Sequence, residues 1–353
     1  MTKPTVVVLS LGGTIASRPD NTGLAGPQSG AADLIAAVPQ LDEIATIEYR
    51  DLACVPSCDL TFDIALQVVS ATAEAVTRGA SGVVVTQGTD TIEEMSFSLD
   101  LLVPQTVPVV MTGAMRHGGQ LGADGPANLL AAVRTAASPA AAGLGTLVVL
   151  NDEIHSAVAV RKRHTSSPSA FVSDAVGPVG WIAEGAVHVR ARPFPRLTVR
   201  LPEGARIPPV PLVRLTMDDD GWWLPALRTA GPPGLVLDGM GGGHVPGWLA
   251  EQVIELAARV PVVLASRTEG GEVLTQTYGG FRGSESMLVA GGLIAARSLG
   301  GLKARVLLGV LSAAGLDRPA ITQVFQRMGT IERRSKADEH TQRTDTKEIL
   351  TWS

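Results

Sequence analysis

The chain has 353 residues, enough for one large α/β domain or two domains of ordinary size. Its formal net charge of −5 offers no basic surface for nucleic acid or an anionic membrane. Its apolar runs are broken by glycine or charge well before the roughly 20 residues that a membrane span needs. We therefore expect a soluble protein with no nucleic-acid and no membrane partner.

The two cysteines, Cys54 and Cys58, stand at a C-x-x-x-C spacing with no histidine nearby. This spacing is typical of neither a redox motif nor a zinc site, so we expect two reduced thiols. The first apolar run begins at residue 6 and leaves no room for a secretory signal peptide. Together these features predict a cytoplasmic protein.

Four short apolar runs predict strands that are buried on both faces of a parallel sheet, because they show no polar alternation. They are residues 6–9, 82–86, 107–112 and 146–150. Residues 61–79 have apolar positions at helical spacing and end in glycine. Residues 124–137 predict a second helix, with Asp124 as its N-cap and Pro126 in its first turn. Strands that alternate with helices predict a doubly wound α/β domain.

The composition changes near residue 190. Residues 190–212 contain six prolines and several arginines, which is typical of an extended linker between domains. The strand and helix patterns then resume, with strands over 235–240 and 261–268 and helices over 246–259 and from about Leu302. We therefore predict a two-domain α/β protein.

The predicted domains differ in size. The larger, N-terminal catalytic domain is expected to carry a mostly parallel sheet, and a smaller α/β domain and a charged tail follow the linker. The tail has no clean apolar face, so we expect it to be mobile. The predicted bounds are 1–189 for the first domain, 190–212 for the linker, 213–331 for the second domain and 332–353 for the tail.

The first apolar run ends in Gly12-Gly13-Thr14, which raises the possibility of a phosphate-binding loop. The dinucleotide fingerprint G-x-G-x-x-G is absent here, and none of the five lysines follows a glycine as a Walker loop requires. The G-x-S-x-G and H-E-x-x-H motifs are also missing, and the six histidines lack metal-ligand spacing. A nucleotide-binding enzyme is therefore a remote alternative.

Hydroxyl and carboxylate side chains remain at the carboxyl ends of the predicted strands, where open α/β sheets bind their ligands. Thr14 follows the first run, and the stretch Thr89-Asp90-Thr91 follows the second at the start of a predicted helix. Taken alone, residues 89–91 are more typical of a helix N-cap, with Glu93 and Glu94 in the first turn.

Lys162 favours a catalytic role for this group. The chain has 29 Lys and Arg residues, of which five are lysine, and both neighbours of Lys162 are arginine. A lysine can lose its proton and act as a base, whereas a guanidinium stays protonated. The alternative is a solvated basic cluster over residues 161–164. A hydroxyl, a lysine and an aspartate together make a known type of activated nucleophile.

These stretches, in this order, resemble the bacterial-type L-asparaginases, which include glutaminase-asparaginases. The matching stretches are LGGTIAS (11–17), VVVTQGTDTIEE (83–94), MTGAMRHGGQLGADGPANL (111–129), VVLNDEIHSAVAVRKRHTSS (148–167) and GSESMLVAGGLIAARSLGGLKARVLL (283–308). The resemblance implies a two-domain α/β fold and hydrolysis of asparagine to aspartate and ammonia, with no cofactor and no metal.

The resemblance also implies the catalytic residues. Thr14 would be the nucleophile that forms an acyl-enzyme with the side-chain carbonyl carbon of asparagine. Thr89, Asp90 and Lys162 would form a second catalytic group that activates a hydroxyl or the hydrolytic water. Which threonine attacks first does not follow from the sequence. The two glycines before Thr14 are expected to leave space for the substrate beside the reactive hydroxyl.

Substrate-binding residues follow from the same resemblance. Ser57, with Gly88 and Thr89 nearby, would hold the α-carboxylate, and Asp90 would bind the α-ammonium group. The backbone carbonyl of Ala114 would face the leaving amide, and the backbone N–H of Thr89 is a candidate oxyanion donor. Glu285 would reach the site of a neighbouring subunit. The family therefore implies a homodimer or homotetramer with sites at subunit interfaces.

The sequence departs from the family pattern at three places. Cys58 stands where a substrate-binding glutamine is common, and a glycine or His244 stands where an asparagine is common. The loop over residues 18–30 lacks the tyrosine of many relatives, so Thr22 or another hydroxyl would take its role. The glycines and prolines of this loop are typical of a closing lid.

The leading hypothesis is a cytoplasmic L-asparaginase. A glutaminase-asparaginase or a D-asparagine amidohydrolase would keep the fold and change the substrate. A related tRNA-dependent amidotransferase subunit would need a further N-terminal domain, which the start of the first strand at residue 6 disfavours. A non-catalytic amino-acid-binding module is a remote alternative, because a sensor does not need a base such as Lys162.

Overall fold

The computed structural model describes residues 2–19, 25–27, 30–104, 106–192, 196–328 and 349–353. The chain forms two compact units, Met1–Thr198 and Val199–Ser353, and the division falls inside the proline-rich stretch 190–212. The two α/β units are described separately below.

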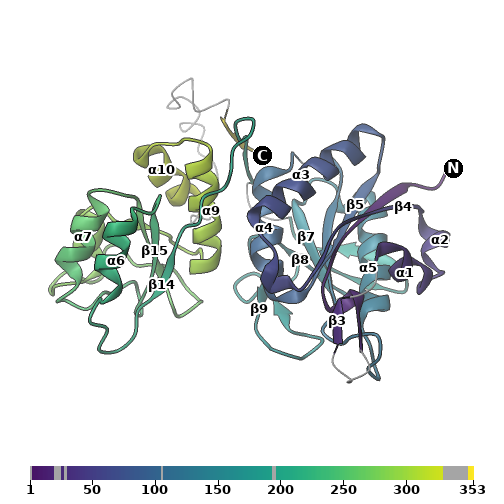
Figure 1. The fold of residues 1–353 in the computed structure, drawn as a ribbon, viewed down its shortest axis with the longest axis horizontal. Helices are drawn as coiled ribbons and strands as arrows, with labels where there is room; N and C mark the ends of the chain where they lie inside the picture. Colours follow the sequence, from purple (N-terminus) through teal and green to yellow (C-terminus); the bar gives the residue numbers. More distant parts are fainter. Residues whose placement is uncertain (1, 20–24, 28–29, 105, 193–195, 329–348) are drawn as a thin grey trace. The chain divides into compact units, whose positions relative to one another are not determined.

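The first unit is built on an eight-stranded sheet with helices on both faces (Figure 1). The order across the sheet is β12-β11-β8-β7-β6-β5-β1-β4. The strands are β1 (Thr5–Gly12), β4 (Thr46–Val55), β5 (Gly82–Thr86), β6 (Val109–Thr112), β7 (Thr146–Leu150), β8 (Glu153–Ser156), β11 (Gly180–Ala183) and β12 (Ala186–Val189). The four predicted runs form β1, β5, β6 and β7, which pair in parallel and are almost entirely buried, so this prediction is confirmed. Strands β8, β11 and β12 extend the sheet in antiparallel pairs.

Helices and short elements complete the first unit. The α-helices are α1 (Ala31–Ala36), α2 (Leu41–Ile44), α3 (Phe62–Thr77), α4 (Ile92–Leu102) and α5 (Gly125–Ala137). The short 3₁₀ helices are η1 (Thr14–Ala16), η2 (Ser57–Asp59), η3 (Thr89–Thr91) and η4 (Pro139–Ala141). The small strands are β2 (Ser17–Pro19), β3 (Ala25–Pro27), β9 (Arg161–Lys162), β10 (Phe171–Val172) and β13 (Leu197–Val199), the last of which ends at the boundary of the units.

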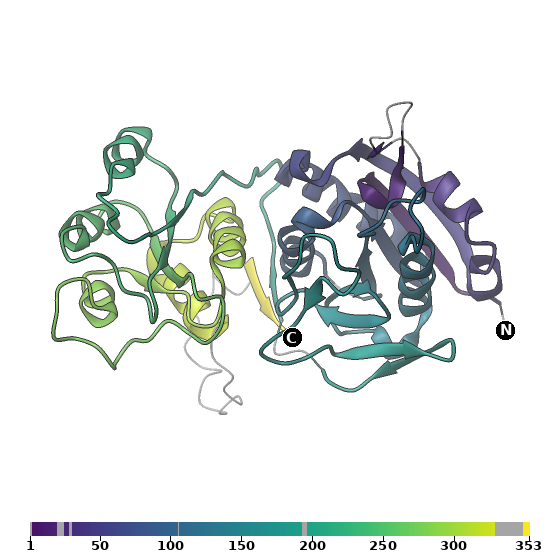
Figure 2. The same ribbon diagram turned by 90° about the horizontal axis from the view of Figure 1, so that it is seen from below.

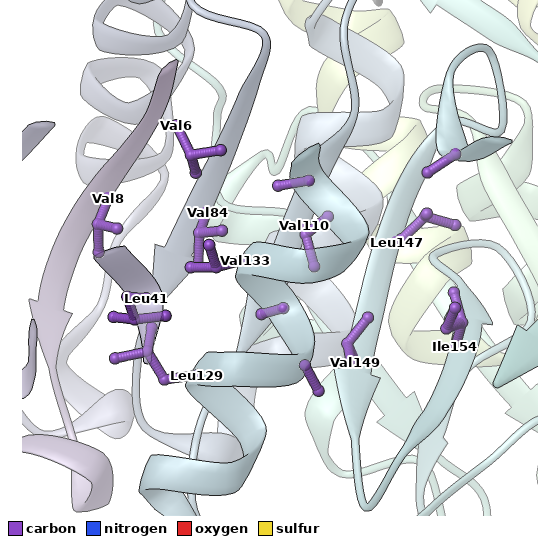
Figure 3. Packing of buried hydrophobic residues seen from close by; sticks show 14 of the residues in the cluster. Val6, Val8, Leu41, Val84, Val110, Leu129, Val133, Leu147, Val149 and Ile154 are labelled. Carbon is purple, nitrogen blue, oxygen red and sulfur yellow. The ribbon is translucent and has the colours of Figure 1, made fainter. Parts of the chain in front are cut away.

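Alternate residues of the central strands supply two apolar cores, one on each face of the sheet. Val84 of β5 and Val110 of β6 pack with Leu129 and Val133 of α5 on one face (Figure 3). The residues that flank Val84 and Val110 within β5 and β6 point to the other face of the sheet, where they pack with α3 and α4. A fully buried valine or leucine contributes on the order of 1.5–3 kcal/mol to stability. The cores therefore hold the carboxyl ends of these strands in fixed positions.

The two helices predicted in this unit form, but the side chain at the predicted N-cap of one of them binds elsewhere. Helix α3 has Thr61 as its N-cap, and the Thr61 hydroxyl accepts the Ile64 N–H at 3.3 Å, as expected at a helix start. Helix α5 begins at Gly125, as predicted, but the Asp124 side chain does not cap it. Asp124 thus occupies the predicted N-cap position, but its carboxylate accepts the backbone N–H groups of Met115 and Arg116 and none from the first turn of α5.

The second unit carries a four-stranded sheet in the order β14-β15-β16-β17, and all of its pairs are parallel. Helices α6 and α7 pack beside each other (Figures 1 and 2). The strands are β14 (Leu212–Arg214), β15 (Leu235–Gly239), β16 (Val262–Ser266), β17 (Ile294–Ala295) and the terminal β18 (Leu350–Trp352). The helices are α6 (Trp223–Ala230), α7 (Ala250–Ala257), α8 (Glu285–Ala290), α9 (Gly301–Ala313) and α10 (Arg318–Met328). A larger unit with a mostly parallel sheet and a smaller α/β unit with a four-stranded parallel sheet confirm the predicted fold class.

The helix predicted over 246–259 begins four residues later than expected, at Ala250. Residues 245–247 are held by the loop before α8 instead. The Val245 N–H donates to the Gly283 carbonyl at 3.0 Å, and a Cβ on Gly247 would lie 3.1 Å from the Arg282 carbonyl oxygen. A tertiary contact therefore competes with the local helical pattern and prevails.

Parts of the predicted linker and tail, residues 193–195 and 329–348, lie outside the described residues. The end of the tail is described and contains strand β18. Within the part of the chain that the structure covers, no helix has the length and apolar character needed to cross a membrane.

Candidate active site

Three loops meet at the carboxyl edge of the first sheet because glycines allow their backbones to touch. The Gly13 N–H donates to the Val55 carbonyl at 3.1 Å, which joins the loop after β1 to the end of β4. A Cβ on Gly13 would lie 1.9 Å from the Gly88 backbone nitrogen, and one on Gly88 would lie 2.8 Å from the Ser57 side chain. The loops after β1, β4 and β5 are thus in direct contact.

This packing corrects the expectation that the glycines before Thr14 leave space for substrate. Protein backbone already occupies the space that side chains at these positions would need. Both glycines also have positive φ, +97° at Gly12 and +80° at Gly13, which L-residues rarely adopt. The glycines therefore position two threonines, because Thr14 and Thr89 each directly follow a glycine of the contact.

Lys162 on β9 connects the two polar side chains that follow β5. Its Nζ lies 2.7 Å from Thr89 Oγ1 and 2.6 Å from Asp90 Oδ1, and its side chain is only 15% exposed. Its backbone N–H donates to Glu93 Oε1 at 2.7 Å, which fixes β9 against the start of α4. The lysine thus reaches a hydroxyl and a carboxylate at once from a nearly buried position.

The neighbouring arginines have other partners. Arg163 donates to Asp174 at 2.7 Å, and Arg161 lies 3.8 Å from the same carboxylate. Lys162, in contrast, reaches Thr89 and Asp90 in the loop after β5. The alternative of a solvated basic cluster describes Arg163, whose side chain is 59% exposed, and does not describe Lys162.

Ser57 and Asp90 form the second pair of the site. Ser57 Oγ donates to Asp90 Oδ2 at 3.0 Å and accepts the Asp90 backbone N–H at 3.3 Å. The pKa of Asp90 is lowered, mainly by its hydrogen bond to Lys162, so Asp90 is an ionised carboxylate at neutral pH. The buried Ser57 hydroxyl and the exposed Asp90 carboxylate thus lie side by side at the mouth of the site.

Residues 89–91 form the 3₁₀ helix η3 and lead directly into α4. Thr91 stands at the N-cap of α4 with Glu93 and Glu94 in the first turn, as the alternative predicts, but no side chain of residues 89–91 makes a capping hydrogen bond to α4. Thr91 Oγ1 instead donates to the Ser57 carbonyl at 3.0 Å. The loop after β5, which contains Thr89–Thr91, is therefore anchored to the loop after β4, which contains Ser57, by backbone and side-chain contacts.

The segment that contains Ala114 packs against the same loop. A Cβ on Gly113 would lie 2.6 Å from the Gln87 carbonyl oxygen and 3.1 Å from Thr89 Cγ2. Asn128 Nδ2 donates to the Gly113 carbonyl at 3.0 Å. Ala114 itself is fully buried. Its backbone is thus held next to Thr89.

The sequence reasoning missed three residues that hold the site in place. Glu93 fixes Lys162, Asp124 binds the backbone N–H groups of the loop after Ala114, and Asn128 binds the Gly113 carbonyl. All three lie inside the stretches that resemble the asparaginases, but a polar residue near a helix start carries no signal for a contact across the fold.

The other predicted site residues fall in different places. Cys58 is exposed in η2 and free, directly after Ser57. Glu285 belongs to the second unit, where its side chain is fully buried, accepts the Tyr278 N–H at 2.7 Å and lies 3.1 Å from His244. Thr22 lies outside the described residues.

The site thus combines hydroxyls, an ionised carboxylate and a lysine at the edge of a parallel sheet. Among the described residues, no group of three or more His, Cys, Asp or Glu side chains is placed to hold a metal ion. Fold and site together define a two-domain α/β protein with a hydroxyl–lysine–carboxylate cluster, an arrangement typical of hydrolases.

The chain belongs to the asparaginase family. The family description "Asparaginase, N-terminal" matches residues 5–195, and "Glutaminase/Asparaginase C-terminal domain" matches residues 209–325. These two matches confirm the resemblance seen in the sequence.

Individual relatives agree with this family. A protein of Deinococcus radiodurans named "Probable L-asparaginase" is 39% identical, over 91% of this chain and 97% of its own length. A protein of Haemophilus influenzae named "Probable L-asparaginase periplasmic" is 32% identical, over 92% of this chain and 93% of its own length. The solved structure of a probable cytoplasmic L-asparaginase from Campylobacter jejuni covers 92% of this chain and 99% of its own, with a TM-score of 0.85 and 32% identity.

Proposed function

We propose that the protein is an L-asparaginase that hydrolyses the side-chain amide of L-asparagine to L-aspartate and ammonia through a threonine nucleophile. The observation that carries the proposal is the position of Lys162 Nζ, within 2.7 Å of both the Thr89 hydroxyl and the Asp90 carboxylate. Membership of the asparaginase family and the names of the relatives support the substrate class.

The first half of the reaction uses Thr14. Its Oγ attacks the amide carbon, a C–O bond forms, and the C–N bond breaks as the nitrogen takes up a proton and leaves as ammonia. An alcohol does not ionise unaided at neutral pH, so the Thr89–Lys162 pair is the proposed base that accepts this proton and returns it to the leaving nitrogen. The backbone N–H of Thr89 is the proposed donor to the oxyanion, and the carbonyl of Ala114 the acceptor for the leaving amide.

The second half uses Thr89, Lys162 and Asp90. In its neutral form, Lys162 accepts a proton through the contact to Thr89, and this chain of hydrogen bonds activates the water that cleaves the acyl-enzyme. The Asp90 carboxylate stabilises the lysine once it is protonated. No cofactor enters this scheme.

The ends of the substrate also have proposed partners. Ser57 and Gly88 would bind the α-carboxylate, Asp90 the α-ammonium group, and Cys58 would border the same end. Glu285 of a second copy would complete the site, so the proposed assembly is a homodimer or homotetramer.

The proposed compartment is the cytoplasm. The cytoplasmic name of the C. jejuni neighbour and the two free cysteines support it, whereas the H. influenzae relative is named periplasmic. Fractionation of cells of the native organism tests the proposed compartment, because a cytoplasmic protein is expected to appear in the same fraction as a cytosolic marker.

Ammonia release tests the proposed function. The wild type is expected to release ammonia from L-asparagine faster than from L-glutamine or D-asparagine, and Thr14→Ala is expected to lose nearly all turnover. Thr77→Ala is a matched control, because that exposed hydroxyl lies on α3 and donates to the Ala73 carbonyl of the same helix at 2.9 Å. Absence of ammonia from every amide would overturn the proposal, and a preference for glutamine or D-asparagine would change its substrate.

A further inference from the structure

The first unit contains a buried histidine that the proposed reaction does not use. His155 lies on β8, with Nδ1 3.0 Å from the Ser173 hydroxyl and Nε2 3.3 Å from the Glu153 carboxylate. A serine, a histidine and a carboxylate in contact are the components of a hydrolytic triad. Ser173 is only 4% exposed and His155 only 1%, however, so the hydroxyl is closed to a substrate. The contact therefore acts within the protein.

The imidazole of His155 is uncharged at neutral pH, because burial lowers its pKa to about 4. A carboxylate only accepts hydrogen bonds, so the ring proton lies on Nε2, toward Glu153, and Nδ1 carries a lone pair. The Ser173 hydroxyl therefore donates to Nδ1. This bond joins β8 of the main sheet to the residue that directly follows β10.

The bond closes a segment of the chain that carries Lys162. Residues 157–172 leave the main sheet after β8 and contain the separate two-stranded hairpin β9–β10. Near the start of this segment, a backbone N–H donates to the Ser156 carbonyl at 2.9 Å. After its end, the Ser173 side chain binds His155. Two adjacent residues of β8 thus hold both ends of the segment.

The turn that begins at Ser173 also holds both neighbours of Lys162. The carboxylate of Asp174 accepts from Arg163 at 2.7 Å and lies 3.8 Å from Arg161. Two backbone N–H groups donate to the Ser173 carbonyl at 3.2 and 2.7 Å, which fixes the turn. The turn thus binds the main sheet through its serine and the hairpin through its aspartate.

Apolar packing also holds the hairpin, but with less precision. Val160, Ala170 and Phe171 are buried in the apolar core on the α3 and α4 face of the sheet. Apolar contacts are not directional, whereas a hydrogen bond restricts both distance and angle. A displacement of about 1 Å in a catalytic group can lower the rate by about 10²-fold. A directional bond at the base of the hairpin therefore matters for proton transfer.

We infer that His155 is a positioning residue for Lys162 and acts through its hydrogen bond to Ser173. The bond holds the β9–β10 hairpin at the position from which Lys162 Nζ reaches Thr89 and Asp90. The inference rests on the proposed function and extends it to a buried residue that touches no reacting atom.

Removal of either partner of the bond tests this role. Ser173→Ala and His155→Leu are each expected to lower kcat for asparagine about tenfold, while KM changes less than twofold, because the substrate-binding loops are unaltered. The double variant is expected to lose no more than either single variant, since both changes break the same bond. In His155→Asn the amide oxygen takes the place of Nδ1 and accepts from Ser173, so kcat is expected to stay within about twofold of the wild type.

Thr135→Val is the matched control for loss of a buried hydroxyl. Thr135 is fully buried on α5 and donates to the Ala131 carbonyl of the same helix at 2.9 Å, so kcat is expected to be unchanged. Urea unfolding gives the temperature at which every variant is folded, and the kinetics are measured there. Additive losses in the double variant, a low kcat for His155→Asn, a normal kcat for Ser173→Ala, or an equal loss in Thr135→Val would overturn the inference. A wild type that releases no ammonia would overturn the proposed function instead.

Discussion

At the scale of single residues, Lys162 is the most informative position of the site. A positive charge alone does not explain why a lysine stands between two arginines, because the arginines of this segment bind Asp174. The lysine extends to Thr89 and Asp90 instead, from a position in which it is 15% exposed. A removable proton distinguishes lysine from arginine at such a site.

Substitution of Lys162 separates the role of a base from that of a charge. Lys162→Met and Lys162→Arg are both expected to lower kcat for ammonia release by about 10⁴-fold, the usual effect of removing one member of a catalytic unit. Arg163→Lys is expected to keep normal activity, and circular dichroism checks the fold of all three variants. A near-normal rate for Lys162→Arg would show that only the charge matters.

His155 on β8 governs a pH dependence of stability. Its side chain is 1% exposed, and burial lowers its pKa to about 4 from 6.5. Glu153 lies 3.3 Å from the ring, but this carboxylate is 44% exposed, so the effect of burial prevails. As the pH falls below 6.5, the unfolded chain binds a proton that the folded chain does not, so the free energy of unfolding decreases.

The expected loss through His155 amounts to about 3 kcal/mol between pH 6.5 and pH 4. Urea unfolding at pH 7 and pH 4.5 measures it. His155→Gln keeps a partner for Ser173, which lies 3.0 Å from the ring, and is expected to remove most of this pH dependence. The exposed His188→Gln is expected to leave it unchanged. Identical pH dependence in wild type and His155→Gln would contradict the assignment.

At the scale of elements, the site depends on backbone contacts between loops that follow different strands. The order β6-β5-β1-β4 places the ends of four parallel strands in a row. Glycines at positions 12, 13, 88 and 113 then let the loops touch without side chains between them. The geometry of the candidate site is therefore a property of the sheet edge, and each loop contributes one or two polar groups to it.

Gly13→Ala tests this contact. The new methyl group would lie 1.9 Å from the Gly88 nitrogen at a φ of +80°, so the loop must move. We expect a loss of stability well above the roughly 1 kcal/mol typical of positive-φ strain, together with loss of turnover. Gly79→Ala is the matched control, because its φ is +93° but no atom lies within 4 Å of the added carbon. Equal destabilisation by both changes, measured by urea unfolding, would refute the role of loop contact.

At the scale of the whole molecule, the proposed assembly would give each site residues from two copies of the chain. Thr14 belongs to the first unit and Glu285 to the second. In a homodimer, a copy that lacks Thr14 and a copy that lacks Glu285 can together form one intact site.

Mixing of inactive variants tests this sharing. Thr14→Ala and Glu285→Ala copies, combined at equal amounts under exchange conditions, are expected to recover about a quarter of the wild-type sites by random pairing. Ammonia release from asparagine at a concentration below KM measures the recovery. Thr14→Ala mixed with Thr89→Val is the control and stays inactive, because both changes lie in the first unit. If the first mixture also stays inactive although mixed dimers form, the sites are not shared.

The sequence by itself determined the class of fold and predicted the residues of the candidate site. Apolar runs without alternation identified β1, β5, β6 and β7, because a strand that is buried on both faces has apolar residues at consecutive positions. Thr14, Thr89, Asp90 and Lys162 were found because strand ends and an unusual lysine are local signals.

The tertiary structure alone decided the partners of these residues. Lys162 and Thr89 are 73 positions apart, and Ser57 and Asp90 are 33 apart. Such contacts depend on strand order and loop packing, which no local pattern encodes. For the same reason, the Asp124 side chain binds the loop after Ala114 and not the first turn of α5, the glycines pack on backbone instead of leaving space, and Glu285 lies 3.1 Å from His244.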